Sequence, residues 1–203
     1  MKDLILEIPN FVPEVLCNHL IKKFDFDQNK QDGVVCMDGE RKVIPELKNC
    51  KEINITKLGR DWEWEDSEMC KIIHDAVKSY FIFLKKNFDH DQPRHMFQKL
   101  IECPPTSDYG YTIQKQSENA KYAWHYDGGF GELNQFTFLF VIIYLNTIEP
   151  GDGGETEFMS GRKVRPERGK IIMFPASWTY PHCGNKILKG DKYILTTIIR
   201  LNP

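Results

Sequence analysis

The second half of the chain consists mainly of short apolar segments separated by turn residues. The longest segment, residues 135–146 (QFTFLFVIIYLN), is a nearly unbroken run of aromatic and β-branched residues. Its length and the Gly-rich stretches beside it favour a strand buried on both faces over a surface helix. Further segments of strand length, each bounded by Gly, Pro, Asp or Asn, cover residues 153–158, 162–169, 170–176, 178–184 and 192–201. Strands this frequent, without helices between them, predict an antiparallel sandwich or barrel.

The first half has the pattern of a scaffold built from helices and short strands. Pro13 is predicted to begin a helix that runs to about Phe24. A second helix is predicted from Ser67 to about Asn87. Its apolar stripe has helical spacing and comprises Met69, Ile72, Ile73, Ala76, Val77, Tyr80 and Leu84. We expect this stripe to pack against the back of the sheet. Short strands are expected within residues 4–8, 34–39 and 50–58.

Length and composition are consistent with one folded unit. A chain of 203 residues can bury a sizeable core, so we expect a single domain over residues 1–203. Residues 1–100 would supply scaffold strands and helices, and residues 101–203 the main β core. The formal net charge of −2 gives no general reason to expect nucleic acid or a membrane surface as a partner. The basic run RKVRPERGK at 162–170 is either a solvated strand face or a binding patch.

Several features of the sequence predict a cytoplasmic location. There is no apolar stretch long enough to span a membrane, and the N-terminal MKDLILEIPNF has too short an apolar run for a signal peptide. The C-terminal IIRLNP is not a KDEL-type retention signal. The six cysteines show no CxxC spacing and no regular framework, which is typical of reduced thiols.

Three residues, His125, Asp127 and His182, form the strongest candidate site. They lie in the strings WHYDGG and YPHCGN. Residues i and i+2 of a strand point to the same side, so His125 and Asp127 can reach one ion while a third ligand comes from another strand. Two histidines and one carboxylate form the facial triad that holds non-haem Fe(II) and leaves coordination positions open. In a chain with six histidines, a sandwich with coincidental His and Asp residues is the alternative.

Six motifs follow one another in the second half of the chain. They are His125-x-Asp127, IYLN at 143–146, GGET at 153–156, the VRPERGKIIMF stretch, His182, and Lys-Tyr at 192–193. In order and spacing they resemble the catalytic core of the Fe(II)/2-oxoglutarate dioxygenases, specifically the prolyl 4-hydroxylase-like branch. The resemblance implies a mainly β fold with a double-stranded β-helix (jelly-roll, cupin-like) core and N-terminal helices packed on the outside. It also implies Fe(II), 2-oxoglutarate and O2, with ascorbate as a candidate reductant.

The resemblance assigns further residues to 2-oxoglutarate. Lys192 would pair with its C5 carboxylate, and Tyr144 and Thr156 would donate hydroxyl hydrogen bonds to the same group. Arg200 is a competing cation, but it lies about 26 Å further along the chain at roughly 3.3 Å per residue, too far to serve the same carboxylate if the strand is continuous. From the residues alone, Lys192 could also be a solvated residue opening a strand, Tyr144 a core tyrosine and Thr156 an ordinary strand threonine.

One position of the expected cosubstrate region departs from the family. Several prolyl 4-hydroxylases have a tyrosine nine residues before the first ligand histidine, where this chain has Gln116. A glutamine could still donate a hydrogen bond to the cosubstrate. From the local pattern, however, we expect Gln114 and Gln116 to be ordinary polar residues of a strand and its turn.

The function implied by the resemblance is hydroxylation, with a prolyl residue in a peptide or protein as the leading substrate and release of succinate and CO2. Family halogenases lack the carboxylate that Asp127 supplies. Nucleobase demethylases of the family have two arginines after the last ligand, whereas CGNKILKGDK follows His182. The alternatives are hydroxylation of a free amino acid or other small molecule, and a cupin-like metal- or ligand-binding module without turnover. Residues 25–45, 104–112 and 128–134 are expected to select the substrate, and the sequence does not indicate an oligomeric state.

Overall fold

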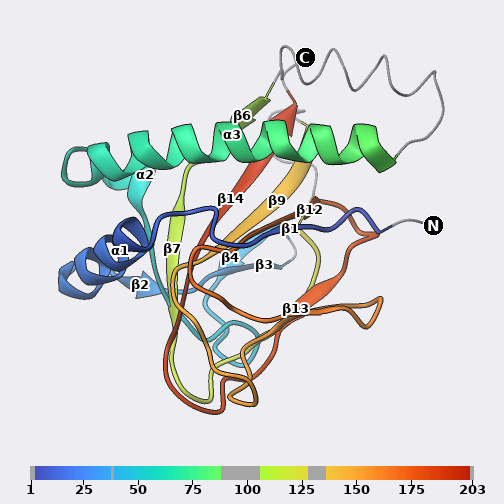
Figure 1. The fold of residues 1–203 in the computed structure, drawn as a ribbon. Coiled ribbons are helices and arrows are strands. Elements are labelled where there is room, and N and C mark those ends of the chain that lie inside the picture. Colours follow the sequence, from blue (N-terminus) through green and yellow to red (C-terminus); the bar gives the residue numbers. More distant parts are fainter. Residues whose placement is uncertain (1–2, 38, 88–105, 128–135, 202–203) are drawn as a thin grey trace.

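Two antiparallel sheets form the centre of the fold (Figure 1). The computed structural model describes residues 3–37, 39–87, 106–127 and 136–201, so the whole of the expected substrate-selecting segment 128–134 and the start of 104–112 lie outside the described part. The major sheet contains β1 (Leu6–Ile8), β2 (Gln31–Asp32), β5 (Lys51–Asn54), β6 (Thr106–Asp108), β7 (Thr112–Gln116), β9 (Phe136–Tyr144), β12 (Ile171–Pro175) and β14 (Lys192–Leu201). Their spatial order is β1-β12-β9-β14-β7-β5-β2, with β6 also paired to β14. The N-terminal half therefore contributes strands to both edges of this sheet.

A smaller sheet lies over one face of the major sheet. It contains β8 (Tyr122–His125), β10 (Thr156–Phe158), β11 (Lys163–Val164) and β13 (His182–Gly184), in the order β11-β10-β13-β8. Apolar side chains of the two sheets meet in a layer between them that includes Ile142, Tyr144, Ile172, Phe174, Ile194, Phe158 and Val164. This confirms the predicted double-stranded β-helix core. A separate hairpin is formed by β3 (Val35–Met37) and β4 (Glu40–Lys42).

The longest apolar segment forms β9 at the centre of the major sheet, as predicted. Because successive side chains of a strand point to opposite faces, it contributes to two cores. Val141 and Ile143 pack toward the helices. Ile142 and Tyr144 pack between the two sheets. The unbroken apolar run thus reflects a strand with no solvated face.

Two helices cover the outer face of the major sheet. They are α1 (Glu14–Phe26) and α3 (Glu63–Asn87), and α3 crosses the strands of the sheet (Figure 1). The predicted stripe of α3 packs on the sheet, and the helix begins four residues earlier than the predicted Ser67. In α1, Pro13 is the N-cap rather than the first helical residue, and the helix continues past Phe24. No helix in the described residues is long and apolar enough to cross a membrane.

The expected strand over residues 50–58 is only half correct. β5 ends at Asn54, and the chain then turns into α2 (Ile55–Leu58) and the 3-10 helix η1 (Gly59–Trp62). The side chain of Asn54 accepts a hydrogen bond of 2.8 Å from the backbone N–H of Lys57 and so caps the turn. Gly59 follows with a φ of 67°, a conformation that glycine adopts without steric cost. A local cap therefore outweighs the β-branched pattern of the segment.

The basic run at 162–170 is neutralised within the chain. Arg162 contacts Asp3 and Glu7 at 2.7 Å each. The remaining ion pairs of the run include Arg165–Glu167, Arg168–Glu14, Lys170–Glu167 and Lys163–Glu157. These acidic partners satisfy the cations, which favours a solvated strand face over a binding patch for this segment.

Candidate functional site

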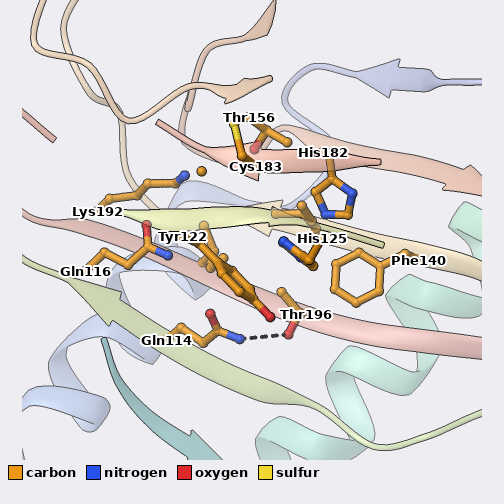
Figure 2. Close-up of a pocket in the computed structure, with 13 residues that line it drawn as sticks. Gln114, Gln116, Tyr122, His125, Phe140, Thr156, His182, Cys183, Lys192 and Thr196 are labelled. Carbon is orange, nitrogen blue, oxygen red and sulfur yellow. Dashed lines mark hydrogen bonds between the residues drawn. The ribbon is translucent and has the colours of Figure 1, made fainter. Parts of the chain in front are cut away.

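The pairing of β8 with β13 brings His125, Asp127 and His182 together. His182 opens β13 and lies opposite His125, the last residue of β8, in the antiparallel register. The centroids of the two imidazole rings are 4.3 Å apart, and Figure 2 shows both rings in one pocket. Asp127 follows β8 by two residues, and one ligand atom from each of the three side chains lies within 4.8 Å of the others. The structure thus gathers all three predicted residues into one group that could hold a metal ion.

Backbone carbonyls orient both histidines. Nδ1 of His125 lies 2.8 Å from the Ala123 carbonyl oxygen, and Nδ1 of His182 lies 3.2 Å from that of Tyr180. Because a carbonyl can only accept, each Nδ1 carries the proton and each Nε2 keeps its lone pair. This arrangement is common among metal-ligating histidines, whose second nitrogen donates to a carbonyl or carboxylate.

The carboxylate of Asp127 completes the donor set. Its Oδ2 atom is buried and has no hydrogen-bond partner in the described structure. His182 Nε2 lies 3.1 Å from this oxygen, but without the geometry of a hydrogen bond. A buried carboxylate oxygen without a donor is costly, and a cation between it and the two Nε2 atoms would remove that cost. Two neutral imidazoles and one carboxylate therefore fit the ligand set of non-haem Fe(II).

Burial keeps the His125 ring neutral, and aromatic side chains pack on both histidines. Burial above all lowers the pKa of His125 to about 4, against the attraction of Asp127. The ring of Tyr122 stacks on His125 with centroids 3.8 Å apart and an interplanar angle of 16°. The ring of Phe174 lies edge-on to His182 at 4.8 Å. His125 is thus unprotonated at Nε2 near neutral pH, and aromatic contacts hold both imidazoles.

Lys192 lies in the same pocket, at the first residue of β14. Its side chain is 2% exposed, and its Nζ donates a hydrogen bond of 2.7 Å to the Gly154 carbonyl. Within the described ranges, no carboxylate is in ion-pair contact with this ammonium group. Burial lowers the pKa of Lys192 to about 8. The site therefore contains a buried cation that lacks a counter-charge.

The two hydroxyl groups predicted beside Lys192 are both nearby, but only one of them reaches the pocket. Tyr144 is fully buried, and its hydroxyl donates to Thr156 Oγ1 at 2.7 Å. Lys192 Nζ lies 5.7 Å from the centroid of the Tyr144 ring. Thr156 lines the pocket together with Lys192, His125 and His182. Tyr144 is not among the lining residues of that pocket; it lies behind Thr156, so only the threonine meets the empty space directly.

The pocket joins the two ends of the site. It encloses about 360 Å³ of empty space, including its open mouth. Figure 2 shows Lys192 and Gln116 at one side and the two histidines at the other, with Tyr122 between them. The predicted cation and the two predicted histidine ligands thus face a common space, although they come from different sheets.

Two glutamines of the pocket were misjudged from the sequence. Gln114 and Gln116 belong to a strand, as expected, but they are only 6% and 2% exposed and line the pocket. Gln116 lies directly opposite Lys192 in the pairing of β7 with β14, and its Oε1 is buried without a hydrogen-bond partner. The signal in the sequence was a strand pattern in which Gln114 and Gln116 share one face and Ile113 lies on the other. Alternation alone, however, does not tell which face meets a cavity.

Arg200 lies at the other end of β14 from Lys192. It pairs with Ser107 of β6 and Thr137 of β9, beyond a register shift between Ile199 and Arg200. Its guanidinium carbon lies 3.8 Å from the centroid of the Tyr109 ring. Arg200 does not line the pocket that contains Lys192.

Comparisons with known proteins agree with this geometry. Residues 111–200 match the family model described as the 2OG-Fe(II) oxygenase superfamily. This range includes all six residues predicted for the site. A comparison with curated protein sequences found no match.

Several solved structures share the fold over nearly the whole chain. A Pseudomonas putida prolyl-4-hydroxylase aligns with a TM-score of 0.66 at 16% identity, covering 98% of this chain and 94% of its own. The viral collagen prolyl hydroxylase of Paramecium Bursaria Chlorella virus-1, solved with 2OG, gives 0.59 at 16% identity, covering 99% and 98%. A Trichoplax adhaerens prolyl hydroxylase, in complex with a hypoxia inducible factor peptide fragment, gives 0.69 at 13% identity, covering 98% and 84%.

At these identities the structural likeness establishes the fold, while the family model describes residues 111–200, the part of the chain that contains the motifs. The superfamily implies Fe(II), 2-oxoglutarate and O2 as reactants, and the His125–Asp127–His182 group offers a suitable metal site. Residues 111–200 thus match the 2OG-Fe(II) oxygenase superfamily, and the chain as a whole has the fold of solved prolyl hydroxylases.

Proposed function

We propose that the protein is an Fe(II)- and 2-oxoglutarate-dependent hydroxylase that acts on a prolyl residue in a peptide or protein and releases succinate and CO2. The observation that carries the proposal is the layout of one pocket. Two histidines line one side of it and converge with the carboxylate of Asp127, and a buried lysine that no described carboxylate contacts lies at the other side. The choice of a prolyl residue rests on the fold neighbours, which include prolyl hydroxylases and one complex with a peptide.

In this proposal His125, Asp127 and His182 hold Fe(II) through the two Nε2 atoms and a carboxylate oxygen. When bound, the ion supplies the activation of O2 that is coupled to decarboxylation of 2-oxoglutarate. The protein fixes which nitrogen of each imidazole is free to bind the ion. The carbonyls of Ala123 and Tyr180 fix the protons of the imidazoles on Nδ1, and burial keeps the His125 ring neutral. No proton then has to leave His125 for the ion to bind.

Lys192 binds the C5 carboxylate of 2-oxoglutarate in this assignment. A charge-assisted hydrogen bond inside the pocket would supply the counter-charge that the buried ammonium lacks. Tyr144 is a positioning residue. Because its hydroxyl donates to Thr156 Oγ1, the hydroxyl hydrogen of Thr156 remains available for the carboxylate. Gln116, opposite Lys192, would turn its amide so that Nε2 donates to the same group.

The decisive experiment measures succinate formation from 2-oxoglutarate with Fe(II), ascorbate as the proposed reductant, and a panel of proline-containing peptides. We expect succinate to form, and mass spectrometry to find a peptide product heavier by one oxygen. His182→Ala should abolish both signals, whereas His74→Ala, an exposed histidine on α3, should leave them unchanged. Succinate formation without any oxidised peptide would refute the prolyl substrate, and its absence under all conditions would refute the enzymatic function.

A further inference from the structure

A second cavity adjoins the pocket of the candidate active site. It encloses about 770 Å³ of empty space, including its mouth, and extends to the β3–β4 hairpin. Gln114 and Thr196 line both cavities, so the two spaces share a wall. None of the residues predicted for iron or 2-oxoglutarate lines the second cavity. The second cavity is therefore available to a ligand group other than iron or 2-oxoglutarate.

The shared wall is polar, and the hydrogen bonds between its side chains are long. Gln114 Nε2 donates to Thr196 Oγ1 at 3.4 Å, which Figure 2 shows as a dashed line. Thr196 Oγ1 in turn donates to the Thr112 carbonyl at 3.5 Å. Both distances lie beyond the usual range for N–H···O and O–H···O hydrogen bonds. A ligand with amide groups could therefore replace these contacts at little cost. Such a wall suits the main chain of a peptide better than an apolar molecule.

Among the described residues that line the second cavity, the charges leave one cation in excess. Lys48 and Glu52 form an ion pair at 2.7 Å, and both side chains are less than 10% exposed. Each of these charges therefore neutralises the other. Arg41, on β4, also lines the cavity, and among the described residues no carboxylate is in ion-pair contact with it. The open guanidinium at the rim favours a ligand with a carboxylate, which it can bind through two parallel hydrogen bonds.

We propose that the second cavity binds the residue next to the oxidised one in a peptide substrate, and that this neighbouring residue has an acidic side chain that pairs with Arg41. The inference rests on the proposed function, because it requires a peptide at the iron site. Consecutive residues of an extended peptide are about 3.3 Å apart and alternate in direction, so a single chain can place one residue in each of two adjoining cavities.

The test uses peptides blocked at both ends, Ac-Gly-Glu-Pro-Gly-Gly-NH2 and Ac-Gly-Gly-Pro-Glu-Gly-NH2, with Gln and Lys versions of each. Binding to the enzyme with Fe(II) and 2-oxoglutarate is measured by calorimetry without O2, so that it does not depend on turnover. We expect a Glu peptide to bind at least about tenfold more tightly than its Gln version, since a hydrogen bond to a charged group is worth about 1.5–3 kcal/mol. Arg41→Glu should reverse the preference in favour of the Lys peptide.

Lys42→Glu is the matched control. Lys42 is the next residue on β4, is exposed, and does not line the cavity. This variant carries the same charge change as Arg41→Glu and should keep the Glu preference. A Gln peptide with a free C-terminus shows whether the terminal carboxylate is the group recognised; if only that peptide binds, the side-chain assignment is overturned.

Equal binding of the Glu, Gln and Lys peptides, an unchanged preference in Arg41→Glu, or no binding of any peptide would also overturn the inference. Failure of the proposed function has a different result. A charge preference that follows Arg41, with no oxidised proline after O2 is admitted, would refute prolyl hydroxylation and retain the acidic-residue cavity.

Discussion

Replacing Lys192 by methionine should change 2-oxoglutarate binding and protein stability in opposite directions. The ammonium group is buried, donates to one backbone carbonyl and forms no ion pair with a carboxylate of the described chain. Burial lowers its pKa from 10.5 to about 8. Since one pKa unit corresponds to about 1.4 kcal/mol, the charged form of this lysine costs the folded protein about 3 kcal/mol. Methionine has a similar length and no charge, so it removes that cost.

The sign of this stability effect follows from proton linkage. The folded-state pKa lies below the unfolded-state value, so between about pH 8 and 10.5 the unfolded chain binds a proton that the folded chain has released. The contribution of Lys192 to the free energy of unfolding therefore rises with pH across this window. At pH 7 the full penalty applies, and the ligand-free methionine variant should be more stable than wild type by about 1–3 kcal/mol.

For 2-oxoglutarate the same substitution should be damaging. Removing one partner of a buried charge pair costs about 3–5 kcal/mol, which corresponds to roughly two to three and a half decades in Kd. Anaerobic calorimetry with Fe(II) measures Kd, and thermal unfolding with and without 2-oxoglutarate measures stability. Lys189→Met, an exposed lysine in the turn before β14, is the control and should change neither quantity. A Lys192→Met protein that melts below wild type, or that binds 2-oxoglutarate as tightly, would refute the reasoning.

Four further outcomes follow from the site and the fold. Wild-type affinity for 2-oxoglutarate should fall above about pH 8, by up to about tenfold per pH unit, because Lys192 loses its proton, and Lys192→Met should lack this decline in calorimetric titrations. Alanine at any one of the three proposed iron ligands should abolish succinate formation while circular dichroism shows an intact fold, and normal turnover in any of them would contradict the metal assignment. Gln116→Leu should raise the Kd for 2-oxoglutarate about ten- to a hundredfold, with Gln28→Leu, an exposed glutamine, as control. Met69→Ala, in the core contact of α3, should lower the free energy of unfolding by about 2–5 kcal/mol in urea titrations, and a loss below about 1 kcal/mol would contradict its placement.

The long elements could be predicted because each repeats its pattern many times. In β9 an unbroken apolar run required two buried faces, and in α3 seven apolar positions recurred at helical spacing. Short elements offered too few repeats. In residues 50–58 the decisive interaction was the single hydrogen bond from the N–H of Lys57 to the side chain of Asn54, which a strand pattern does not reveal. Such caps compete with propensity on equal terms, since both are worth about 1 kcal/mol.

Strand register is the part of the site that the sequence did not contain. Motif order indicated His125, His182 and Lys192, but only the pairing of β8 with β13 makes the histidines neighbours, and only the pairing of β7 with β14 sets Gln116 against Lys192. Shifting β7 by one residue would place Lys115 opposite Lys192 instead of Gln116 and turn the glutamine toward the helices. Lys115 in fact points to the other face, where it pairs with Asp191. Among the described residues, the pocket therefore has one buried cation rather than two, and this single positive charge, facing a neutral amide, supports the proposal that a carboxylate of 2-oxoglutarate binds there.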